Sequence, residues 1–207
     1  MLRKHYLNKK NMILEVAEQL FASEGYTSTS IDDIASKCDI TKAAIYYHFK
    51  NKQELYRYIL QKNFMNLAQN IEIAVGNEDK VENKFIAYVI TFAQEIQNSK
   101  HIASLLMREM ANGGKDMPPD ALKEMLRTFK SLTLIIKSGN EQKIFKCIEP
   151  MIMQMMIIGS LSFLFTTQKI RKKVKEESDT GAKVDIQHSF EQSAYKISMT
   201  LLNSLEE

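Results

Sequence analysis

The sequence is poor in the residues that interrupt helices and in those that cross-link chains. Its 207 residues include three prolines, seven glycines, two cysteines and no tryptophan. Because proline and glycine disfavour helix interiors, their scarcity favours long helices. The alternating pattern of strands flanked by hairpin signals is also absent. Cys38 and Cys147 lie far apart without CxxC or Cys/His spacing, which argues against a disulfide framework or a zinc site and fits a reducing cytoplasm. A redox role for either thiol stays open.

Composition and charge narrow the functional class only modestly. The chain is 44% hydrophobic and 26% charged with a net charge of +3, which is ordinary for a globular protein and neither demands nor excludes a polyanionic partner. The first residues, MLRKHYLNKK, contain no apolar run of signal-peptide length, so we expect a cytoplasmic protein. Pro150 to Gln168 carries no formal charge and approaches the roughly 20 residues of a membrane span. Polar residues interrupt this stretch, and a packed interior or subunit-interface helix explains it better.

Glycines and prolines divide the chain into about nine expected helices with no sheet. We expect Gly25 to end the first helix and Gly76 to end a long fourth one, and we place Gly139 and Gly181 in later connections. Gly159 alone is expected inside a helix, where it suggests close approach of packed helices. The charged stretch 169–183 is expected to be a helix end running into a solvated loop. Between the breaks, apolar residues recur every three or four positions, as in Val81, Phe85, Tyr88, Val89, Phe92 and Ile96.

Residues 8 to 60 contain the cap signals of three short helices and the start of a fourth, the first helix spanning 8–24. Ser30 is expected to begin the second helix, with Asp33 three residues later in a capping-box arrangement. After a turn, Thr41 caps the third helix and Asn51 caps the fourth. Two short helices joined by a tight turn are the form that places a second helix in the major groove of DNA.

The third helix is expected to have one buried and one exposed face. Ile45 and Phe49 lie one turn apart and must pack inward. The Thr41 hydroxyl and the first amides can bind phosphate, while Lys42 and Lys52 supply charge. Residues 1–52 hold eight basic and six acidic residues, and a basic arm ahead of the first helix is expected to reach the DNA backbone or minor groove. The outward residues are Lys42, Ala43, Ala44, Tyr46, Tyr47 and His48.

The segment TSTSIDDIASKCDITKAAIYYHFKNKQEL resembles the signature of the TetR family of transcriptional regulators. In that family a threonine or serine caps the second helix and a hydrophobic-Tyr-x-His-Phe run forms the recognition helix. Asp39 departs from the glycine frequent in the turn and Ala43 from a glycine frequent on the recognition helix, but neither change breaks the motif. The resemblance implies DNA contacts from Thr29 or Ser30, Thr41, Lys42, Ala43, Ala44, Tyr46, Tyr47, His48 and Lys52.

Simpler interpretations of three of these residues stay open. Tyr46 could pack between helices, His48 could be a polar surface residue, and Lys52 could be a solvated lysine in the first turn of its helix. The joint occurrence of two capped helices, the turn and the YYHF run favours DNA binding over these alternatives.

By the same resemblance, the remaining helices form a ligand cavity and a dimer interface. The segments 148–168 and 186–205 resemble the family's dimerisation pair, so charges at Leu161 and Leu201 are expected to yield monomers. A small, largely apolar effector of unknown identity is expected in a Met-rich, aromatic interior. The candidate ligand residues are Tyr88, Phe92, Arg108, Phe129 and Met155.

The sequence therefore predicts an all-α regulator with a helix-turn-helix domain at 1–54 and a larger ligand-binding and dimerisation domain at 55–207. We expect a homodimeric repressor that is released from palindromic double-stranded operator DNA by its effector. The alternative is an architectural or cell-division DNA-binding protein that has this fold and no effector. None of the four histidines lies in a catalytic or metal-binding motif, so we expect no enzyme activity, no metal, no cofactor and no membrane partner.

Overall fold

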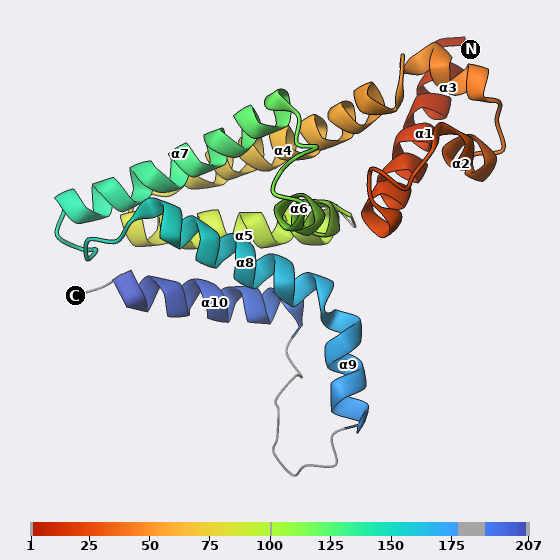
Figure 1. The fold of residues 1–207 in the computed structure, drawn as a ribbon. Helices are drawn as coiled ribbons and strands as arrows, with labels where there is room; N and C mark the ends of the chain where they lie inside the picture. The colour runs from red at the N-terminus through yellow and green to blue at the C-terminus, as the bar shows by residue number, and fades with distance from the viewer. Residues whose placement is uncertain (1, 100, 178–188, 206–207) are drawn as a thin grey trace.

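The computed structural model describes residues 2–99, 101–177 and 189–205. These residues form ten α-helices and no β-strand, which confirms the all-α fold. Helices α1 to α3 make a small unit at one end, and α4 leads from it into a larger bundle (Figure 1). The helices are α1 (Leu2–Glu24), α2 (Ile31–Lys37), α3 (Lys42–His48), α4 (Lys52–Gly76), α5 (Val81–Asn98), α6 (Ile102–Ala111), α7 (Pro119–Glu141), α8 (Pro150–Thr166), α9 (Gln168–Glu177) and α10 (Phe190–Leu205).

Two boundaries differ from those expected. The first helix begins at Leu2 rather than at residue 8, so the basic residues near the N-terminus belong to α1 and form no separate arm. A tenth helix, α9, occupies the start of the charged stretch and projects from the bundle (Figure 1), while residues 178–188, including Gly181, lie outside the described part of the chain. The domain boundary predicted after residue 54 lies in the first turn of α4, a helix shared by both units, and stays a prediction.

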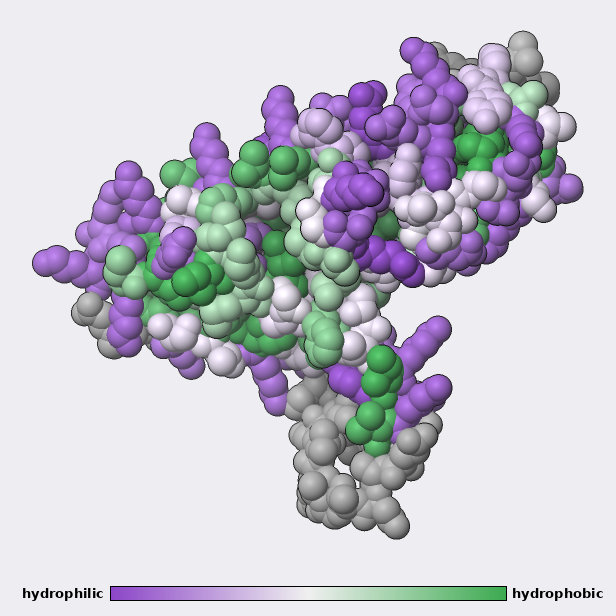
Figure 2. Space-filling view, viewed as in Figure 1, coloured by the Kyte–Doolittle hydropathy of each residue, from purple (hydrophilic) through white to green (hydrophobic). Residues whose placement is uncertain are grey.

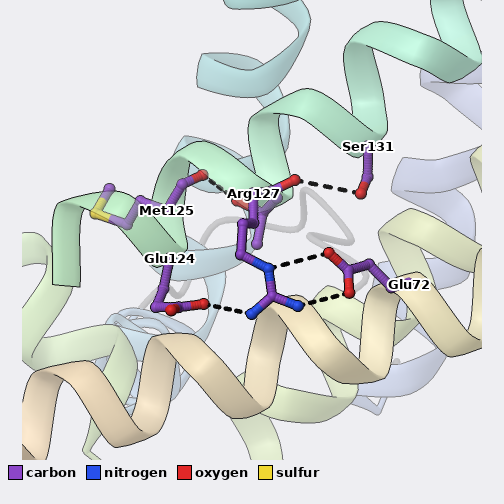
Figure 3. A network of polar contacts seen from close by, with 6 residues as sticks. Glu72, Glu124, Met125, Arg127 and Ser131 are labelled. Atoms are coloured by element: carbon purple, nitrogen blue, oxygen red, sulfur yellow. Dashed lines mark hydrogen bonds and ion pairs between the residues drawn. The ribbon is translucent and has the colours of Figure 1, made fainter. Parts of the chain in front are cut away.

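The larger bundle is organised around α4, which packs against both α5 and α7. Leu55, Leu60, Phe64 and Ile71 on α4 are fully or almost fully buried. An ion-pair network at the surface spans the same helices (Figure 3), where Arg127 on α7 donates two hydrogen bonds to the Glu72 carboxylate of α4, at 2.6 and 3.1 Å. Because these groups are half exposed, we attribute the α4–α7 packing to the buried apolar side chains rather than to this network.

Helix α8 accounts for the uncharged stretch noted in the sequence. Its Met153, Ile157 and Leu161 are buried in the bundle, while apolar residues on the opposite side are exposed. Figure 2 shows hydrophobic side chains gathered over α8 and along one side of α9. In the described residues no single helix has the length and hydropathy of a membrane span; only the pair α8 and α9 together, bent by 62°, meets those criteria.

Gly139 lies inside the last turns of α7 and not in a connection, which corrects the expected position. The Phe145 ring of the following loop packs directly on it, and a Cβ atom at position 139 would stand only 2.1 Å from Phe145 Cδ2. The ring is itself buried and makes an edge contact with Phe85 of α5, with ring centroids 6.3 Å apart. A glycine is required here because a side chain would expel the ring that closes this end of the bundle.

We predict that Gly139→Ala lowers the free energy of unfolding by about 1–3 kcal/mol, because the added methyl group overlaps the Phe145 ring. The matched control is Gly76→Ala at the end of α4, where an added Cβ meets nothing within 4 Å. That control should be neutral or stabilising by up to about 1 kcal/mol. Urea unfolding of both variants checks the prediction, and equal midpoints for the two would contradict it.

Candidate nucleic-acid interface

Local hydrogen bonds fix the ends of the three helices that carry the candidate DNA contacts. The Ser30 hydroxyl accepts from the amide of Asp33 at 3.1 Å, and the Asp33 carboxylate accepts from the Ser30 amide at 2.8 Å, which confirms the capping box. The Ser30 hydroxyl also donates to the Asp33 carboxylate at 2.5 Å, and this bond together with the one from the Ser30 amide lowers the pKa of Asp33. Thr41 caps α3 through the Ala44 amide, and Asn51 caps α4, as expected. The start of each helix is therefore set by residues within four positions of it.

The turn between α2 and α3 depends on a left-handed backbone at Asp39, whose φ is +52°. This is the position where the sequence departs from the expected glycine. Aspartate tolerates the conformation better than most residues with a side chain. The turn is closed by the Ile40 amide, which donates to the Ala35 carbonyl at 3.0 Å. The departure from glycine therefore leaves the geometry of the turn intact.

The orientation of α3 agrees with the faces expected from the sequence. Ile45 and Phe49 are buried in the core of the small unit, whereas Tyr46 is 50% and Tyr47 is 75% exposed. Lys42 and Ala43 are exposed, and Ala44 and His48 are half-buried. Tyr46 therefore does not pack between helices. Within α3 only Ile45 is buried, and contact with DNA stays a prediction for each of the outward residues.

Residues from neighbouring helices extend this surface. Lys10 of α1 lies over the Tyr58 ring of α4, with its Nζ 4.3 Å from the ring centroid. Burial, Lys10 and Lys9 together lower the pKa of His48, so both lysines lie close enough to α3 to act on it. Sequence reasoning counted the basic residues of α1 but did not identify Tyr58, because nothing in its local pattern distinguishes it from other exposed positions on α4.

Two of the residues inferred to contact DNA have structural roles instead. Thr29 is only 1% exposed, and its hydroxyl donates to the Gly25 carbonyl at 2.8 Å, so it is removed from the candidate contacts. The Lys52 ammonium donates to the carbonyls of Tyr26 at 2.9 Å and Thr29 at 3.0 Å and lies 4.4 Å from the Tyr26 ring centroid. Lys52 is therefore neither a solvated lysine nor free for phosphate, because it holds the loop between α1 and α2.

Arg108, inferred to bind the ligand, lies at the end of α1. Its Nε donates to the Ala22 carbonyl at 2.7 Å, and its Nη2 donates to the Ser23 carbonyl. The next residue, Glu109, is buried and accepts a hydrogen bond from the Tyr56 hydroxyl of α4. Helix α6 thus joins the small unit to the larger bundle. Sequence reasoning missed this role because the partners of Arg108 are backbone carbonyls far away in the chain.

The other candidate ligand residues do not gather around one cavity. Tyr88 is fully buried, and its hydroxyl donates to Gln154 at 2.7 Å. Phe92 borders an apolar void of only about 10 Å³, close to the smallest space that holds one water molecule. Phe129 is half-buried on α7, and Met155 is 65% exposed on α8. The described structure therefore does not bring these residues together with Arg108 into a ligand site.

Comparisons with known proteins agree on the nature of the small unit. Residues 13–59 match the family model for bacterial regulatory proteins of the tetR family. The chain is 42% identical over 55 residues to the negative transcriptional regulator IcaR of the biofilm operon icaADBC of Staphylococcus epidermidis, an alignment covering 27% of this chain and 30% of that protein. It is 40% identical over 101 residues to the HTH-type transcriptional regulator YuxN of Bacillus subtilis, covering 49% of this chain and 35% of that protein. The alignments thus span about a third of each relative.

Solved structures extend the similarity of fold to almost the whole chain. The fatty acid degradation regulator FadR from Bacillus halodurans superposes with a TM-score of 0.72 at 17% identity, over 94% of both chains. The regulator FadR from Bacillus subtilis, in complex with stearoyl-CoA, superposes with a TM-score of 0.71 at 14% identity, over 93% of this chain and 97% of that one. At such identities the likeness is one of fold alone.

We predict that Lys52→Met destabilises the protein, because it leaves the partly buried carbonyls of Tyr26 and Thr29 without their donor. The loss should be about 1–3 kcal/mol in the free energy of unfolding. Lys42→Met is the matched control, since Lys42 pairs at 2.6 Å only with the exposed Asp32, and it should cost less than about 0.5 kcal/mol. Chemical unfolding measures both. A Lys52→Met variant as stable as the control would show that Lys52 does not hold the loop.

Proposed function

We propose that the chain, whose residues 13–59 match the family model for bacterial regulatory proteins of the tetR family, is a homodimeric repressor of this family that binds palindromic operator DNA through α3 and is released by a small-molecule effector. The observation that carries this proposal is the division of α3 into two faces. Ile45 and Phe49 anchor the helix in the core, while Lys42, Tyr46 and Tyr47 remain outside on a capped helix next to the basic residues of α1.

The exposed face of α3 has the chemistry that groove binding requires. The small side chains of Ala43 and Ala44 permit close approach to base pairs, and the helix N-terminus favours phosphate. Lys42 is paired with Asp32 at 2.6 Å, but both groups are more than half exposed. Such a surface ion pair contributes at most about 1 kcal/mol, so Lys42 can exchange Asp32 for a phosphate at little cost.

The exposed apolar face of α8 supports dimerisation through this helix and α10. Phe163 is 62% exposed, and Gly159, on the same face, has nothing within 4 Å of an added Cβ. Leu161 and Leu201, proposed above as interface positions, are instead buried within the subunit, so charges there would unfold it. The exposed apolar residues of α8 are Met151, Ile152, Met155, Met156 and Phe163.

Effector release is proposed from the likeness of fold to a ligand-binding regulator. The transcriptional regulator FadR from Bacillus subtilis, which has this fold, was solved in complex with stearoyl-CoA. The packed core around Tyr88 and Phe92 favours the alternative, a DNA-binding protein without an effector. A thermal-shift screen separates the two, because a true effector raises the melting temperature and lowers operator affinity. If no compound does both, the alternative is favoured.

We predict that Tyr47→Ala reduces sequence preference, because Tyr47 is the most exposed aromatic side chain of α3 and is placed toward base edges. Removing one base contact should cost about 1–3 kcal/mol on the cognate operator and little on random DNA. Fluorescence anisotropy with both DNAs measures the specificity ratio.

The matched comparison is Lys42→Ala, which removes a contact assigned to phosphate. This variant should weaken binding to all sequences about equally and lower the slope of log affinity against log salt by about one unit per half-site. Both variants should keep the wild-type melting temperature, since both side chains are exposed. If Lys42→Ala changes sequence preference while Tyr47→Ala does not, the roles assigned to the two side chains are reversed.

We also predict that Phe163→Glu combined with Met155→Glu produces a folded monomer with weak operator affinity, because two charges per subunit would enter the apolar contact between α8 helices. Light scattering measures the molar mass of the variant in solution and so distinguishes monomer from dimer. The control is Ile73→Glu, an equally exposed apolar position on α4, which should stay dimeric. A dimeric double variant would place the interface elsewhere.

A further inference from the structure

A cleft of about 340 Å³ lies where the small unit meets the larger bundle. The end of α1, the loop after it, α4 and the end of α6 contribute its walls. It is separate from the core residues Tyr88 and Phe92, which are not among its lining residues. The residues that give it its chemistry are Phe21, Tyr26, Tyr56, Glu109 and Asp116.

Glu109 is the unusual member of this set, because it is a carboxylate that is only 3% exposed. Its Oε1 accepts a hydrogen bond from the Tyr56 hydroxyl, but its Oε2 is buried without a hydrogen-bond partner among the described residues. An unsatisfied buried carboxylate oxygen is costly, and such groups call for an explanation such as a missing ligand. Because Glu109 lines the cleft, a ligand in the cleft could donate a hydrogen bond to Glu109 Oε2.

The rest of the cleft favours a positively charged donor with an apolar body. Phe21 and Tyr26 both pack against Tyr56, with ring centroids 4.9 and 4.7 Å away. Burial, the hydrogen bond to Glu109, and the charges of Glu109 and Asp116 raise the pKa of Tyr56, so negative charge acts on the aromatic wall. Aromatic faces beside carboxylates are the surroundings that bind organic cations.

Arg108 is the one basic residue among those that line the cleft, and it does not cancel the negative charge of the carboxylates there. Arg108 already donates to the Ala22 and Ser23 carbonyls of α1. Three carboxylates also line the cleft, those of Glu24, Glu109 and Asp116. Lys52 is not a lining residue but lies 4.4 Å from the Tyr26 ring centroid, so three carboxylates stand against two cations and the surroundings of the cleft keep a net negative charge of one.

We propose that this cleft binds a small primary amine in its ammonium form. The ammonium group donates a hydrogen bond to Glu109 Oε2, and the apolar body of the ligand lies against the rings of Tyr26 and Tyr56. A quaternary ammonium would lack the N–H donor that the unpaired oxygen needs, and a neutral alcohol would lack the charge. The site goes beyond the proposed function, because binding here requires neither DNA nor an opening of the core around Tyr88.

The test uses 2-phenylethylamine as the probe and 2-phenylethanol as its neutral counterpart, measured by isothermal titration calorimetry on the full-length protein near pH 7. The amine should bind saturably at one site per chain, and the alcohol should bind at least about tenfold more weakly, as expected for loss of a charge-assisted hydrogen bond. Glu109→Gln keeps an acceptor for the Tyr56 hydroxyl and should weaken amine binding at least about tenfold. The charge-matched control, Glu15→Gln, changes an exposed residue of α1 outside the cleft and should bind as wild type.

Equal binding of the amine and the alcohol, an unchanged affinity in Glu109→Gln, or no saturable binding of the amine up to millimolar concentration would each overturn the proposal. If Glu109→Gln does not fold, Asp116→Asn replaces it, since Asp116 lines the same cleft beside Tyr56. This variant should weaken amine binding severalfold, and an unchanged affinity would again overturn the proposal. Because no DNA is present, the outcome is independent of whether the protein is a repressor.

Discussion

The end of α1 and the loop after it present backbone carbonyls that accept hydrogen bonds from two cations, one on α6 and one on α4. Arg108 of α6 donates to Ala22 and Ser23, and Lys52 at the start of α4 donates to Tyr26 and Thr29. Helix C-termini carry partial negative charge, so cations are favoured there. The position of the small unit relative to α4 and α6 depends on these contacts.

The residues around the hydrogen bonds of Arg108 and Lys52 fit closely between α1, α4 and α6. Gly25 has a φ of +94°, and an added Cβ would lie 3.3 Å from Arg108 Nη1, so both backbone conformation and space favour glycine. Phe21, Tyr26 and Tyr56 fill the volume between the two cations. Any displacement of α4 or α6 must therefore move the end of α1 or break charged hydrogen bonds. For the proposed dimer, these contacts are a physical route by which an event in the larger bundle would change the spacing of the two α3 helices.

Helix α8, which carries no formal charge, has one side buried in the subunit and the other side exposed. Its buried side packs into the subunit through Met153, Ile157 and Leu161, whereas Met155 and Phe163 remain exposed. The stretch is apolar all round, so its sequence carries no periodic signal that separates the two sides. The exposed side forms a hydrophobic patch of the kind that marks protein–protein contacts.

The sequence by itself determined the helical fold, the capped ends of α2, α3 and α4, the left-handed position of Gly25 and the inward turn of Ile45 and Phe49. Each depends on residues within about four positions of one another, and such interactions are encoded in local spacing. Only the tertiary structure decided that Arg108 caps α1, that Lys52 holds the loop after it, that Thr29 is buried, that Leu161 faces inward and Phe163 outward, and that Tyr88 is bonded to Gln154. These outcomes depend on which helices pack against each other. Contacts between residues far apart in the chain produce no periodic pattern in the sequence.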